Sequence, residues 1–140
     1  MGLDMYLHRV NKADRKKYKE LKEQGYEDIK LDYEEVAYWR KANQIREWIV
    51  NNTKYESDWD CVSIKIGKKK LKKLRDDCKA VLEDHSKANE LMPTSSGFFF
   101  GDTDYDEYYY NVLNNTVKMI NKILDETDFE TQRIEYYEWW

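Results

Sequence analysis

The chain has 140 residues, of which 41% are hydrophobic, 37% charged and 15% aromatic, and its formal net charge is −4. This length suits one domain, residues 1–140, with a single core, and the aromatic content argues against a disordered chain. The acidic balance argues against a protein that binds nucleic acid with its whole surface. Neither a signal peptide nor a run of roughly 18 apolar residues is found, so we expect a cytoplasmic protein with no membrane partner.

The charge is divided unevenly along the chain. From Glu83 to the end there are 13 acidic and 4 basic residues, so the preceding part is basic. Most of the positive surplus lies between Lys65 and Lys79. We interpret these lysines as the solvated face of a helix. A patch for an anionic partner is the alternative, and its binding would weaken steeply with salt.

Three elements are predicted in the first half of the chain. Leu3, Met5 and Leu7 alternate with polar residues, which is typical of a half-buried strand. Residues 13–24, rich in Lys and Glu and followed by Gly25, predict a loosely packed helix. A second helix is predicted over residues 33–51, because one arc of a helical wheel collects several apolar side chains. That arc contains Tyr38, Ala42, Ile45 and Ile49.

The second half predicts two strands and two long helices. Val62, Ile64 and Ile66 alternate as in a strand, and a helix follows Gly67. The buried side of that helix is predicted to contain Leu71, Leu74, Cys78, Val81 and Leu82. Pro93 ends a short helix.

The last helix has its own start signal and a long apolar stripe. Asp104 is predicted to cap it, with Glu107 completing a capping box. Its stripe contains Tyr109, Val112, Leu113, Thr116, Ile120, Ile123 and Leu124. A closing strand is predicted over residues 132–137. The sequence therefore predicts an α+β fold in which a small sheet of about three strands packs with three to five helices.

No catalytic residue, metal site or cofactor is predicted. Asp102, Asp104 and Asp106 have the spacing of half a calcium loop, but that loop needs glycine and glutamate where Glu107 and Leu113 stand. These acids are better explained by helix capping. The histidines (His8, His85) and cysteines (Cys61, Cys78) lack the spacing of zinc ligands. We interpret His85 as solvated and the cysteines as buried thiols, and no phosphate-binding or nucleophile motif is found.

Aromatic residues mark a candidate binding surface. Seven of the thirteen residues from Phe98 to Tyr110 are aromatic, and consecutive tyrosines on a helix are about 100° apart, so they do not all face the core. On the predicted helix 33–51, Trp39, Arg40 and Asn43 lie opposite the apolar arc, and Trp and Arg are enriched at binding hot spots. Two interpretations stay open: these residues contact a ligand, or Trp39 packs under the loop from Gly97 to Gly101.

Three blocks of the sequence resemble a family of small tailed-phage and prophage proteins. The blocks read MGLDMYL (residues 1–7), EVAYWRKAN (35–43) and LMPTSSGFFFGDTDYDEYYY (91–110), and they cover about a quarter of the chain. The segment from Asn11 to Leu31 does not match that family. The resemblance implies a phage-borne accessory protein and supplies no catalytic residue.

Two of these blocks are the aromatic clusters, so we expect them to meet in the fold. Aromatic faces, a guanidinium group and the backbone N–H groups of a Gly/Ser loop suit a planar anionic ligand such as a nucleotide. The predicted ligand-binding residues are Tyr38, Trp39, Arg40, Asn43, Ser95, Ser96, Gly97, Phe99, Tyr105 and Tyr108.

The leading hypothesis is a non-enzymatic phage protein that counters host defence in the host cytoplasm by sequestering a nucleotide-like signal. The second is an inhibitor that binds a host defence protein such as a CRISPR nuclease, with the same aromatic residues as anchors. The third is a small enzyme acting on nucleotides. Association between copies through the aromatic C-terminus, residues 136–140, is a further hypothesis.

Overall fold

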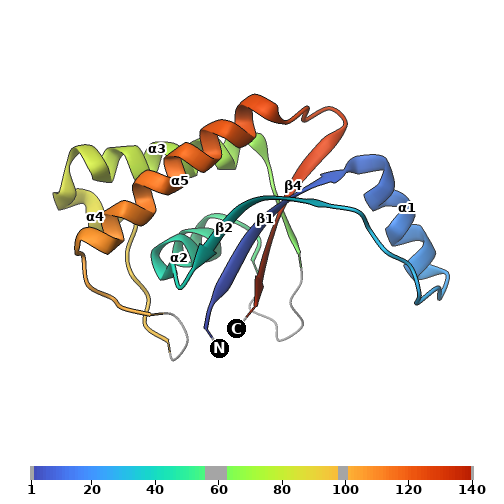
Figure 1. Ribbon diagram of the computed structural model, residues 1–140, viewed down its shortest axis with the longest axis horizontal. Coiled ribbons are helices and arrows are strands. Elements are labelled where there is room, and N and C mark those ends of the chain that lie inside the picture. Colours follow the sequence, from blue (N-terminus) through green and yellow to red (C-terminus); the bar gives the residue numbers. More distant parts are fainter. Residues whose placement is uncertain (1, 56–62, 98–100, 140) are drawn as a thin grey trace.

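The computed structural model describes residues 2–55, 63–97 and 101–139, and it has an α+β fold with a four-stranded antiparallel sheet (Figure 1). The strands are β1 (Asp4–Asn11), β2 (Glu34–Arg40), β3 (Ile64–Ile66) and β4 (Gln132–Trp139), in the spatial order β2-β1-β4-β3. Both termini therefore lie at one end of the two central strands, where Asp4 pairs with Trp139. Predicted residue Val62 lies outside the described residues.

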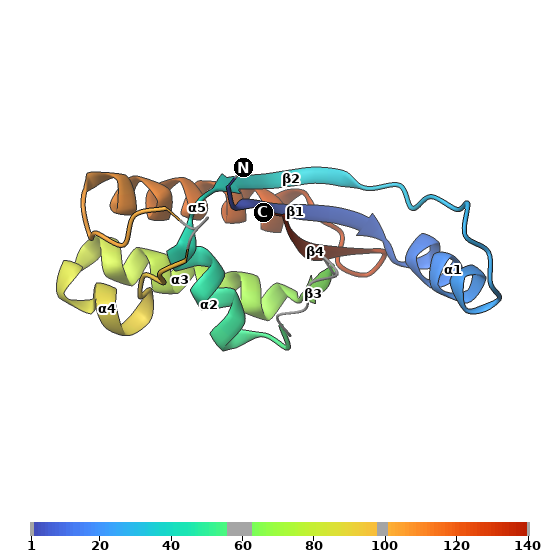
Figure 2. The same ribbon diagram turned by 90° about the horizontal axis from the view of Figure 1, so that it is seen from below.

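The helices are α1 (Lys12–Glu23), α2 (Asn43–Asn52), α3 (Lys68–Glu83), α4 (Ala88–Leu91) and α5 (Glu107–Glu126), with a short 3-10 turn, η1 (His85–Lys87). Figure 2 shows α3 and α5 running side by side, while α1 projects beyond the far end of the strands. No residue of α1 is buried, which confirms the prediction of a loosely packed helix. Gln24 is its C-cap, and Gly25 follows with a φ of 93°, which is easily adopted without a Cβ.

The predicted helix over residues 33–51 is wrong in its first half. Residues 34–40 form the edge strand β2, and the helix begins at Asn43. Ala37 and Trp39 are buried beside Leu7 and Met5 of β1, whereas Tyr38 and Arg40 point to the opposite face. This segment is rich in β-branched and aromatic residues, which pack well in a sheet once a neighbouring strand is present.

The core lies between one face of the sheet and the helices. Leu3, Met5 and Leu7 of the N-terminal segment pack with Leu71 and Leu74 of α3. The predicted apolar stripe of α5 is confirmed, with Leu113, Ile120 and Ile123 at most 1% exposed. Cys78 is buried, and burial raises the pKa of its thiol, so it is a poor nucleophile. The lysines of α3 are exposed, as expected for a solvated helix face.

The start of α5 differs from the prediction by two residues. Asp106, not Asp104, is the N-cap, and its carboxylate accepts a hydrogen bond from the Tyr109 N–H at 3.1 Å. Asp104 instead donates its backbone N–H to the Asp102 carboxylate at 2.9 Å, which forms a turn before the helix.

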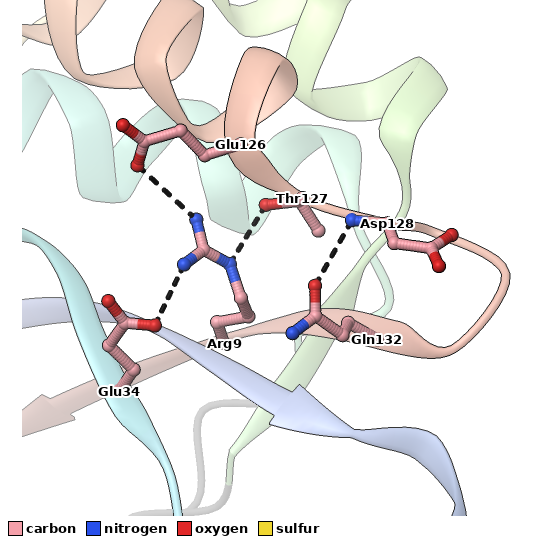
Figure 3. A network of polar contacts seen from close by, with 6 residues as sticks. All are labelled: Arg9, Glu34, Glu126, Thr127, Asp128 and Gln132. Atoms are coloured by element: carbon pink, nitrogen blue, oxygen red, sulfur yellow. Dashed lines mark hydrogen bonds and ion pairs between the residues drawn. The ribbon is translucent and has the colours of Figure 1, made fainter.

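Arg9 connects the other end of α5 to the sheet (Figure 3). Its Nε donates to the Thr127 hydroxyl at 3.0 Å, and its Nη1 lies 2.8 Å from a carboxylate oxygen of Glu34 on β2. Its Nη2 lies 3.9 Å from Glu126, beyond hydrogen-bond distance. The side chain is 8% exposed, so this charge is stabilised by two carboxylates from different elements.

Candidate binding site

The turn between β2 and α2 brings all three conspicuous sequence blocks together. Lys41 at this turn has a φ of 54°, and its backbone N–H donates to the Leu3 carbonyl at 2.6 Å. A Cβ added to Gly101 would lie 3.0 Å from the Cβ of Lys41, and one added to Gly2 would lie 2.8 Å from its Cε. The N-terminal segment and the loop after α4 thus pack closely against this lysine because glycine occupies both positions.

Asn43 joins this turn to the loop. Its side chain is 1% exposed, with Nδ2 donating to the Asp102 carbonyl at 2.8 Å and Oδ1 accepting from the Ser95 N–H at 3.0 Å. One amide therefore bridges the two arms of the loop, and Ser96 and Gly97 are exposed at the tip of the described part. Predicted residue Phe99 lies outside the described residues.

Trp39 belongs to the core. Its indole is 4% exposed and donates from Nε1 to the Thr116 hydroxyl on α5 at 2.8 Å. The Thr116 hydroxyl in turn donates to the Val112 carbonyl at 2.7 Å, so both polar groups are satisfied. The indole therefore anchors the sheet to α5. Trp39 is also one of the residues that line a neighbouring groove.

That groove, with a volume of about 480 Å³, lies between β2 and α5. It gathers Tyr38, Trp39, Arg40 and Tyr108 from the predicted set, together with Ala42, Val112, Asn115, Lys118 and Met119. The Tyr38 and Tyr108 side chains are 43% and 55% exposed. Two tyrosines and two cations, Tyr38, Tyr108, Arg40 and Lys118, thus line one groove at the sheet edge, where the Tyr38 and Arg40 side chains leave β2 on the face opposite the core.

The groove side chains are held by contacts within the protein. The Tyr108 hydroxyl donates to the Arg40 carbonyl at 3.1 Å, and the Tyr38 hydroxyl donates to the Asp4 carboxylate at 2.5 Å. The hydrogen bond to Asp4 raises the pKa of Tyr38 and keeps its phenol neutral. Arg40 Nη1 lies 3.4 Å from the same carboxylate, and the side chain is 52% exposed, which leaves guanidinium N–H groups accessible to a ligand.

The remaining predicted residues lie outside the groove. Tyr105 packs edge-on against Tyr109, with ring centroids 4.9 Å apart, and its hydroxyl donates to the Asn89 side chain at 3.1 Å. The loop after α4 contains Ser95, Ser96 and Gly97, and the Asn43 side chain bridges its two arms. The nine predicted residues that the structure describes therefore divide between a groove, a core anchor and a loop.

The sequence analysis missed Lys118 and Asn115. Both lie on the same helix face as Tyr108 and Val112, at spacings of three to four residues, so this helical period would have found them. It also missed Lys41, because nothing in the sequence indicates that two glycines distant in the chain pack against it.

A buried polar network was missed as well. Arg46 Nε lies 2.7 Å from the Glu138 carboxylate, which also accepts hydrogen bonds from the Tyr55 and Tyr136 hydroxyls. Burial, followed by the Glu138 carboxylate, raises the pKa of Tyr55 to about 12. Arg46 of α2 is 9% exposed and is paired with Glu138 of β4.

Asp102, Asp104 and Asp106 come together as their spacing suggests. Their carboxylates lie within 4.8 Å of one another, and all three side chains are exposed. Two of these carboxylates accept backbone N–H groups, in the Asp102 turn and at the Asp106 cap. Turn formation and capping account for them.

Comparison with protein-family models, with curated proteins and with solved structures finds no match for this chain. Within residues 2–55, 63–97 and 101–139, none of the helices has the combination of length and apolar character required to cross a membrane.

Proposed function

We propose that this protein is a binding protein that takes a planar anionic ligand of the nucleotide class in the groove between β2 and α5. The observation that carries the proposal is the combination of two exposed tyrosine rings with Arg40 and Lys118 on one concave surface of about 480 Å³. Pockets of roughly 300–1,000 Å³ are typical of small-molecule sites.

Each group has a role that fits this ligand class. The phenol faces of Tyr38 and Tyr108 offer stacking surfaces for a base, an interaction that any base provides. The accessible N–H groups of Arg40 suit phosphate oxygens, and Lys118 adds a second positive charge. The hydrogen bonds of the two tyrosines to Asp4 and to the Arg40 carbonyl limit the ordering that ligand binding requires.

The resemblance to small phage proteins suggests a biological setting for this activity. A protein that sequesters a nucleotide-like signal of host defence needs affinity and abundance, and needs no catalytic group. The convergence of the three resembling blocks at the Arg40–Lys41 turn supports a ligand site beside this turn.

Titration calorimetry with adenosine and guanosine mono- and diphosphates and with cyclic dinucleotides tests the proposal. We expect at least one of these probes to bind, and Tyr108→Ala and Arg40→Gln each to weaken its binding by about tenfold or more, since stacking is worth roughly 1–3 kcal/mol per base. Tyr26→Ala is the matched control, because Tyr26 is 57% exposed, like Tyr108, and does not line the groove. Absence of binding across the panel, or equal binding by wild type and groove variants, refutes the proposal.

A further inference from the structure

The sheet face opposite the core carries a row of three tyrosines. Tyr6 of β1 pairs directly with Tyr38 of β2 on one side and with Tyr137 of β4 on the other. The ring centroids of Tyr6 and Tyr38 are 5.3 Å apart, and those of Tyr6 and Tyr137 are 6.0 Å apart. The row thus crosses three neighbouring strands at one level of the sheet.

A second group of rings continues from this row. His8, two residues after Tyr6, stacks on Tyr33 with ring centroids 4.1 Å apart and an angle of 23°. His8 also lies 6.0 Å from Tyr137, so the rings form one connected surface. Trp139, 55% exposed, stands on the same face of β4 as Tyr137.

This surface is hollowed. A depression of about 400 Å³ lies over Tyr6, Glu35 and Trp139, and a cleft of about 640 Å³ lies between the sheet, α1 and the segment before β2. The two hollows share His8, Tyr33 and Tyr137. A ligand longer than one ring system therefore has a continuous path across the face.

Positive charge exceeds negative charge where the path meets β4 and β3. The Glu135 carboxylate is 1% exposed and pairs with both Arg15 of α1 and Arg133, whose Nε lies 2.8 Å away. Despite this short distance, the Arg133 Nε–H has no hydrogen-bond partner. Lys65 of β3 is the direct neighbour of Glu135, so three cations surround one carboxylate.

We propose that this face of the sheet binds single-stranded nucleic acid. Stacking of successive bases on exposed rings and cations beside the path are the two features by which proteins hold single strands without regard to sequence. Among the described strand residues on this face, the aliphatic side chain is Val10, which is 2% exposed under α1. The cleft beside α1 also has the half-buried Ile29 and Leu31 in its lining, so the row of rings on the strands is the part of the face that favours stacked bases.

The net charge of −4 does not oppose this assignment, because the acidic surplus belongs to the chain from Glu83 onward, most of which lies outside this face. Four cations (Arg15, Lys30, Lys65, Arg133) and three carboxylates (Asp32, Glu35, Glu135) line or adjoin the two hollows, a surplus of one positive charge, so we expect a shallow salt dependence. Two or three phosphate contacts between the protein and a single strand give a slope of log K against log salt of roughly −1.4 to −2, because each contact releases counterions. The inference concerns a second surface and stands independently of the groove ligand, although Tyr38 contributes to both.

Fluorescence anisotropy with labelled oligothymidine and oligouridine of about ten nucleotides tests the proposal on the full chain. Tyr137→Leu and Tyr38→Leu keep apolar bulk but remove a stacking face, and each is expected to weaken binding about tenfold, which corresponds to about 1.4 kcal/mol. Tyr38→Leu guards against loss of folding, since this side chain is 43% exposed. Tyr26→Leu is the control and is expected to bind like wild type.

Variants on the groove and on α3 separate this surface from the others. Tyr108→Ala is expected to lose the mononucleotide and keep the oligonucleotide, whereas Tyr137→Leu is expected to do the reverse, so each proposal can fail alone. If Lys69→Glu or Lys72→Glu in α3 abolishes oligonucleotide binding and Tyr137→Leu does not, the oligonucleotide binds to α3. That result overturns the inference. A wild-type dimer in light scattering that Tyr137→Leu converts to a monomer, without oligonucleotide binding, shows that the face is a contact between copies and also overturns it.

Discussion

The two faces of the sheet use the same kinds of side chain in opposite ways. On the covered face, Trp39 and Tyr136 are buried and direct their polar atoms to Thr116 and Glu138. On the other face, Tyr38 and Tyr137 keep part of their ring surface accessible, and Tyr38 is the immediate neighbour of Trp39. Strand alternation alone separates the residue that stabilises the fold from the residue that is available for binding.

The difference between the two faces divides the aromatic residues of this chain into two groups. Aromatic residues whose N–H or O–H has an internal partner contribute to stability, because their burial removes a large apolar area from water without leaving a polar atom unpaired. Aromatic residues whose faces remain exposed contribute less to stability and, where they cluster, mark a candidate contact surface. The comparison therefore predicts that stability and binding can be changed separately.

Substituting one aromatic residue on each face tests the difference between the faces most directly, and it has the largest expected effect on stability. Trp39→Ala removes a buried indole and is expected to lower the free energy of unfolding by roughly 3–5 kcal/mol. Tyr38→Ala, one residue away, is expected to cost less than about 1 kcal/mol because its ring is 43% exposed. Urea denaturation followed by circular dichroism measures both, and equal losses would contradict the assignment of the two faces.

The buried charge pair gives a somewhat smaller effect. Arg46→Met leaves the Glu138 carboxylate without its cation and is expected to cost roughly 3 kcal/mol. The double change Arg46→Met with Glu138→Gln removes both charges and keeps an acceptor for the Tyr55 and Tyr136 hydroxyls, so it should be more stable than the single variant. A double-mutant cycle from urea unfolding measures the coupling, and additive effects would show that the pair does not act as a unit.

The smallest expected effect is a pH dependence of stability that comes from His8, on the sheet face opposite the core. Burial lowers the pKa of His8 below its ordinary value of 6.5, although Glu35 and Glu135 partly oppose this. The unfolded chain then binds the proton more readily, so this stability is present above about pH 6.5 and declines as the pH falls below it. His8→Gln should flatten that decline in thermal unfolding between about pH 7.5 and 5.5, and an unchanged profile would exclude His8 as its source.

Much of the fold could be predicted because local patterns are strong where one face is buried. The alternation of Leu3, Met5 and Leu7 predicts β1, and the stripe from Tyr109 to Ile123 predicts α5, since burial imposes a period of two or 3.6 residues. The exposed lysines of α3 and the unburied α1 also follow from the sequence. The α+β class was therefore determined by the sequence itself.

The tertiary structure decided the identity of β2 and the composition of the candidate site, because both depend on strand pairing and on contacts between residues far apart in the chain. Residues 34–40 fit an arc of a helix by themselves, and only hydrogen bonding to β1 makes them a strand. That strand turned Trp39 into the core and turned Tyr38 and Arg40 to the opposite face, at the edge that lines the groove. The contacts of Lys41 with Gly2 and Gly101, the row Tyr38–Tyr6–Tyr137 and the Arg46–Glu138 pair join residues far apart in the chain. No local period encodes such contacts, because they arise from chain topology.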